Sequence, residues 1–212
     1  PYVDNLSADA TKSFIELTYE KYFKRFTRYF GSTIKGFFDD ERGLYANFLN
    51  IEDRGTLPYS HELPDAHGRM HKVSFTDDVV AIYGGQEAAN QEARVRFFQT
   101  LEELYTANLK RLKAWCNSHQ VSFIGHLLVE EDPLEFIKTQ AYPSRTLAVF
   151  DIPGCDVIGG FNPLKQNMAL AMARLVASSR SRRGILSESF GAFGHGLRVE
   201  DISTVLSWQA QR

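Results

Sequence analysis

The chain has 212 residues, of which 43% are hydrophobic and 13% aromatic, enough to bury the core of one globular domain. Its net charge of −2 and the lack of a polybasic cluster argue against a nucleic-acid or anionic-membrane partner. The nearest basic run contains Arg180, Arg182 and Arg183, and such a short run is typical of a solvated helix end.

The first half of the chain predicts a helix, a strand and a second, long helix. Apolar residues at helical spacing predict the first helix over residues 7–30, and the apolar run at 34–38 predicts a strand. Residues 42–85 are rich in Gly, Pro, His and Asp, so we expect either a long functional loop or lid, or small elements within it. The long helix is expected over residues 87–116.

The second half continues the alternation. A buried strand is expected at residues 121–129, because an apolar run of this length suits a strand that is covered on both faces. The elements expected after it are helices at 133–139 and up to 151, a two- or three-residue strand at 157–158 after a sharp turn, a helix at 164–178, a strand at 185–187 and a helix at 199–209.

Helices that alternate with buried strands predict an α/β fold with parallel strands. Four such strands make about half of a (β/α)8 TIM barrel, which needs roughly 250 residues; an open doubly wound sheet is the alternative. We expect residues 1–212 to be a single α/β domain, a fragment of the catalytic barrel of a larger multidomain protein. Unpaired strand edges would then let the isolated chain self-associate.

Acidic residues follow three of the predicted strands. Asp40 and Glu41 follow the first, Glu130 and Glu131 the second, and Glu188 the fourth. In barrels of this type the chemistry takes place at the carboxyl ends of the strands. Carboxylates that converge there are what glycoside hydrolysis requires.

The second strand places His126 and Glu130 on one face, because side chains alternate along a strand. A satisfied core histidine is the alternative interpretation of His126. The acids that follow this strand also have an alternative interpretation, because Pro133 favours Asp132 as the N-cap of the next helix. On the first strand the alternation predicts Asp39 and Glu41 on one face and Asp40 on the other.

Glu188 leaves a buried strand between Ser187 and Ser189, which can hydrogen-bond to it. Phe190 and Phe193 offer an aromatic surface of the kind that packs against a sugar ring. A carboxylate that caps a helix is the alternative.

Cofactor signatures are weak in this sequence. The glycines at 191–196 do not have the spacing of a dinucleotide or phosphate-binding loop. A histidine-rich group lacks any metalloprotease signature; it contains His61, Glu62, Asp65, His67 and His71. We therefore expect no cofactor and no catalytic metal, and a structural calcium ion stays open.

Five motifs in chain order resemble a group of large bacterial glycoside hydrolases, barrel enzymes similar to α-L-rhamnosidases and more distantly to the β-galactosidase clan. The motifs lie at residues 34–41, 57–64, 125–131, 151–156 and 186–194. The resemblance implies the central part of a barrel flanked by β-sandwich domains. It implicates Glu41, Glu130 and Glu188 as rim carboxylates, with His126, Asp156 and the Tyr59 loop nearby.

We expect a glycoside hydrolase in which Glu130 is the general acid and Glu188 the base or nucleophile, with the reverse assignment open. The residues expected to bind the carbohydrate substrate are Asp40, Glu41, Tyr59, His126, Glu131, Asp156, Phe190 and Phe193. One alternative is a non-catalytic carbohydrate-binding or scaffold domain derived from such an enzyme. Another is a metal-dependent hydrolase, for which only His126 is suitably placed.

Overall fold

The fold was obtained as a computed structural model, which describes residues 3–44, 56–84, 87–130, 132–157, 163–179, 184–192, 194 and 196–211. Its centre is a four-stranded sheet in which every pairing is parallel and the order is β1-β2-β3-β4. The strands are β1 (Gly36–Arg42), β2 (Ser122–Leu127), β3 (Ile152–Val157) and β4 (Leu186–Ser189). The predicted parallel α/β fold is therefore confirmed, with strands side by side in chain order. Such an order is common to an arc of a (β/α)8 barrel and to one half of a doubly wound sheet.

The third strand starts earlier than expected. Pro153 and Gly154 look like a turn in the sequence, but Pro153 pairs with Gly125 of β2 and Gly154 with Leu186 of β4. Gly154 suits this place because a Cβ there would lie 3.1 Å from the carbonyl oxygens of both Gly125 and Leu186. Packing between neighbouring strands thus overrides the local turn preference.

The helices match the expected alternation, with two differences. Their bounds are α1 (Ala8–Leu17), α2 (Tyr19–Phe26), α3 (Leu63–His71), α4 (Phe75–Gly84), α5 (Glu87–Ser118), α6 (Pro133–Gln140), α7 (Pro143–Leu147), α8 (Pro163–Ser179) and α9 (Val199–Gln211). The expected first helix divides at Thr18, whose backbone leaves the helical region while its hydroxyl group hydrogen-bonds to the carbonyl of Phe14. The described part of segment 42–85 contains the short helices α3 and α4, so it has elements of its own.

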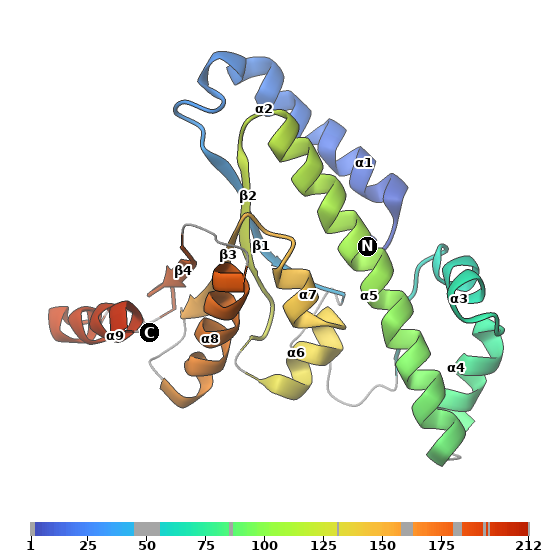
Figure 1. Ribbon diagram of the computed structural model, residues 1–212. Coiled ribbons are helices and arrows are strands. Elements are labelled where there is room, and N and C mark those ends of the chain that lie inside the picture. The colour runs from blue at the N-terminus through green and yellow to red at the C-terminus, as the bar shows by residue number, and fades with distance from the viewer. Residues whose placement is uncertain are drawn as a thin grey trace.

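The sheet packs against the helices through two hydrophobic clusters. Helices α5 and α7 contact β2, and α8 contacts β3. On the face of the sheet that the helices cover, Phe123 and Leu127 of β2 are fully buried in the main cluster. Cys155 and Val157 of β3 are fully buried in a second cluster, which includes residues of α8. Figure 1 shows α1 and α2 along the other side of α5, and α3 and α4 beside its N-terminal half, away from the sheet.

None of the described helices is long and apolar enough to cross a lipid bilayer.

Candidate active site

Four polar side chains share the face of the sheet opposite the helices. On β2, His126 lies between Gly125 and the core residue Leu127, so its side chain points away from the core. Asp156 of β3 lies between core residues in the same way, and it pairs in register with Glu188 of β4. With Asp40 of β1, one polar residue comes from the carboxyl-terminal part of every strand.

A β-bulge brings a fifth polar group, Glu41, to this face. The register between β1 and β2 shifts between Asp39 and Arg42, and Glu41 has a φ of 45°, in the left-handed region. Strict alternation would place Glu41 with Asp39 on the helix side. That expectation is wrong: Glu41 hydrogen-bonds to the Asp156 side chain, while Asp39 stays buried in a bidentate pair with Arg42.

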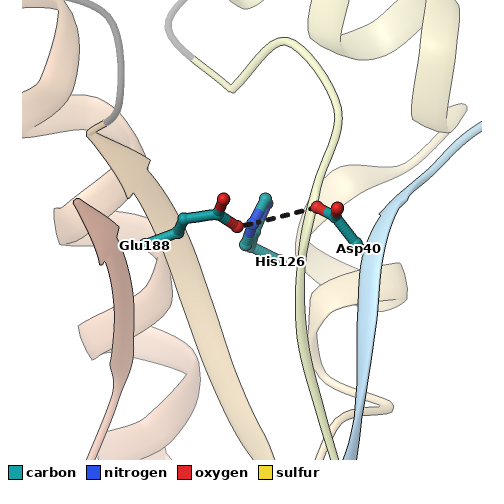
Figure 2. A group of neighbouring side chains, drawn as sticks. All are labelled: Asp40, His126 and Glu188. Atoms are coloured by element: carbon teal, nitrogen blue, oxygen red, sulfur yellow. Dashed lines mark hydrogen bonds and ion pairs between the residues drawn. The ribbon is translucent and has the colours of Figure 1, made fainter. Parts of the chain in front are cut away.

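His126 lies between two carboxylates. Its Nε2 is 2.9 Å from Oε2 of Glu188 and 3.7 Å from Oδ1 of Asp40. Figure 2 shows the imidazole between these two side chains, which come from the outer strands β1 and β4. The histidine is fully buried, while the side chains of Glu188 and Asp40 are 37% and 63% exposed, so solvent reaches the carboxylates and not the ring.

The surroundings favour the imidazolium form of His126. Burial lowers its pKa, but Glu130 and the hydrogen bond to Glu188 outweigh burial, so that the pKa of His126 is raised. Its Nδ1 faces the carbonyl of Leu127 at 3.4 Å, and only the charged ring has a proton for both sides. The pKa of Asp40 is also raised, first by burial and then by the charge of Glu188.

Glu41 and Asp156 form a second group beside the first. Burial, the charges of Asp156 and Asp40, and the hydrogen bond to Asp156 together raise the pKa of Glu41 to about 7, although His126 opposes them. Two carboxyl groups can hydrogen-bond to each other only if one of them carries a proton. The arrangement can therefore hold an acidic proton near neutral pH, at a half-buried side chain.

Glu130 lies below this edge of the sheet rather than on its surface. The residue is 2% exposed, and its two oxygens accept hydrogen bonds from the backbone N–H groups of Leu127 and Asp156, both at 2.8 Å. Burial raises its pKa to about 8, against the effect of His126 and of these two bonds. Glu130 thus connects β2 to β3 and supports both His126 and Asp156.

Asp40, His126 and Glu188 are the one group in the described part of the chain with the spacing of metal ligands, their ligand atoms lying within 4.8 Å of one another. The direct hydrogen bond between His126 and Glu188 accounts for the grouping without a cation, and we do not assign these residues as ligands. The histidine-rich group of the α3 region does not reach such spacing among the described residues.

Comparison of the chain with models of known protein families, with curated proteins and with solved structures gives no match. The parallel α/β fold and the geometry of this edge are therefore the basis for any functional conclusion.

The remaining predicted site residues lie elsewhere or outside the described residues. Tyr59 is exposed, and its ring contacts His61 and Phe75 near α3 and α4. Phe190, next to Glu188 in the sequence, is partly buried and packs against the second core cluster. Glu131 and Phe193 fall outside the described residues.

Two residues near the site have structural roles that the sequence suggested only in part. Asp132 caps α6, its Oδ1 accepting from the N–H groups of Leu134 and Glu135, which confirms the capping alternative. Asp39 forms an ion pair with Arg42. No pattern in the sequence indicated the contact between Glu41 and Asp156, because that contact depends on the bulge.

Proposed function

We propose that this protein hydrolyses glycosidic bonds by acid/base catalysis at the carboxyl edge of its sheet. The observation that carries the proposal is the convergence of four carboxyl groups and one imidazolium from four strands on a single face. Hydrolysis of a glycosidic bond needs one carboxyl group that donates a proton and one carboxylate that acts on the sugar or on water.

Glu188 suits the second of these roles. Its carboxylate is partly exposed, and the hydrogen bond to His126 fixes its orientation. A carboxylate held in this way can act as the nucleophile or as the base that activates water. The proton donor then comes from the remaining acids, among which Glu130 has little access to a substrate.

A panel of aryl glycosides and oligosaccharides tests the proposal. We expect the parent protein to release reducing sugar from at least one of them. Glu188→Gln should lower turnover by about a hundredfold to ten-thousandfold, and Glu103→Gln, at an exposed position of α5, should leave it unchanged. Substrates that bind in calorimetry without any turnover would overturn the catalytic proposal in favour of a carbohydrate-binding domain.

The same assay, repeated after dialysis against EDTA, tests for a metal. We expect the rate to be unchanged, because the hydrogen bond from His126 orients Glu188 without a cation. A loss that an added divalent cation restores would instead make Asp40, His126 and Glu188 metal ligands and the protein a metal-dependent hydrolase.

A further inference from the structure

We infer that Glu41 is the proton donor of this site and that it shares its proton with Asp156. The inference rests on the proposed function and names the residue that protonates the leaving group. Three observations carry it: the contact between the two carboxyl groups, the backbone conformation that creates this contact, and the excess of acids over bases at this edge.

The contact itself requires a proton. Glu41 and Asp156 come from β1 and β3, with β2 between them in the sheet, and their side chains hydrogen-bond across that strand. A pair of ionised carboxylates offers acceptors only, so the hydrogen bond exists only while one partner is protonated. Asp156 is 7% exposed and Glu41 is half-buried, which makes Glu41 the member that a substrate can reach.

The backbone of Glu41 is held in an unusual conformation. A φ of 45° is uncommon for a residue other than glycine, and such conformations cost on the order of 1–3 kcal/mol where they persist. The neighbouring contacts maintain it: Asp39 and Arg42, on either side of the bulge, are fixed to each other by a bidentate ion pair. The effect is that two consecutive acids, Asp40 and Glu41, reach the same face.

The charge balance keeps a proton on the pair. The groups that face Glu41 are Asp40 on its own strand, His126 on β2 and Asp156 on β3. The one histidine of this group is hydrogen-bonded to Glu188, so the acids around Glu41 outnumber the positive charges that act on it. Glu130 supports this arrangement as a positioning residue, because one of its oxygens holds the backbone N–H of Asp156.

Hydrolysis of a glycoside consumes one water molecule and leaves the protonation of Glu41 unchanged. When the bond between the anomeric carbon and the glycosidic oxygen breaks, its electron pair stays on the oxygen, which takes the proton of Glu41 and leaves as an alcohol. Water supplies the hydroxyl group of the anomeric carbon, and its second proton restores the Glu41–Asp156 pair.

The experiment compares Glu41→Gln, Asp156→Asn and the control Glu103→Gln on aryl glycosides with good and poor leaving groups. Glu41→Gln should lower kcat/KM about a hundredfold to ten-thousandfold for poor leaving groups and less than about tenfold for good ones. The parent rate should fall as the pH rises through about 7, and this decline should vanish in Glu41→Gln. Asp156→Asn removes a neighbouring negative charge, so the decline should move to lower pH.

An equal loss on all leaving groups, or an unchanged alkaline decline in Glu41→Gln, would overturn the role of Glu41 while leaving the glycosidase proposal intact. Infrared difference spectra provide a readout that needs no activity. Glu130, whose pKa is also raised, contributes a carbonyl band of its own, so the component that disappears as the pH passes about 7 should be the one that is missing from Glu41→Gln and retained in Glu130→Gln. The band without hydrolysis of any glycoside would overturn the proposed function and the donor role together, although the shared proton would stand.

Discussion

At the scale of single residues, chemically identical side chains at this edge differ because their surroundings differ. Glu41 contacts another carboxyl group at a half-buried position, whereas both oxygens of Glu130 accept backbone N–H groups in the interior. Glu188, on β4, is hydrogen-bonded to Nε2 of His126. The environment of Glu41 favours a protonated acid.

If Glu130 is a structural connection between strands, Glu130→Gln should lower stability. The amide group would present a donor to one of the two backbone N–H groups and leave it without an acceptor, a cost of about 1–3 kcal/mol. Urea unfolding of Glu130→Gln and of the exposed control Glu103→Gln measures this difference. Parent-like stability together with lost turnover would instead support Glu130 as the general acid.

At the scale of elements, the site depends on close contact between strands. A Cβ at Gly125 would lie 2.4 Å from the carbonyl oxygen of Asp39 and 2.8 Å from the ring of Phe150. Only glycine lets β1 approach β2 at this point, directly before Asp40 on one strand and His126 on the other.

We expect Gly125→Ala to destabilise the protein by about 1–3 kcal/mol, because the strands must move apart to accept the methyl group. The distance between Asp40 and His126 should change with it, and activity should fall more than stability alone explains. Thermal unfolding, with Gly84→Ala as the control at a site where no atom lies within 4 Å of the added Cβ, tests this. Equal unfolding temperatures for parent and Gly125→Ala would contradict the close approach.

Helices α3 and α4 are attached to α5 by a buried polar network. His67 is fully buried, with Nδ1 3.0 Å from the hydroxyl of Thr100 and Nε2 2.8 Å from Asp78. Arg96 of α5 adds two bonds to the same carboxylate. This order of groups resembles a catalytic triad, but the Thr100 hydroxyl is buried and donates to the carbonyl of Arg96, so the network is structural.

The bonds from Arg96, with those from His67, lower the pKa of Asp78 below its usual value. Its stabilising effect is therefore complete above about pH 4, the pKa range of an unfolded aspartate, and is lost as the pH falls through the lower folded pKa. Asp78→Asn should lower the free energy of unfolding at pH 7 by about 1.5–3 kcal/mol. This deficit should shrink below about pH 4, while Asp77→Asn, at an exposed neighbouring position, should show none.

At the scale of the whole molecule, the described sheet has two edges, since β1 and β4 each pair with one strand. The face that carries the acids also exposes Phe38, 45% accessible and 5.4 Å from the ring of His126. Unpaired edges of parallel strands and exposed apolar side chains favour association with further strands.

We expect the isolated chain to self-associate through these edges as its concentration rises. Size-exclusion chromatography with light scattering over a range of concentrations measures the mass directly. A compact monomer at every concentration would contradict the expectation and would favour a sheet that is complete by itself.

The sequence by itself determined the class of fold and the edge of the sheet where the acids meet. Buried apolar runs that alternate with helical periodicity predict parallel strands, and the carboxyl ends of parallel strands lie together, so the acids after these strands were expected to converge. Asp40 and Glu188 do meet there, on either side of His126. These are local patterns, and the helices and strands that they predict formed, although β3 begins at Ile152 and the first helix divides at Thr18.

Only the tertiary structure decided what each acid does there. The bulge that turns Glu41 toward Asp156 arises from a register shift between two strands that α3, α4 and α5 separate in the sequence, and no local pattern encodes it. The burial of Glu130 depends on the backbone of a third strand, and the environment of a carboxyl group, rather than its place in the sequence, sets its pKa.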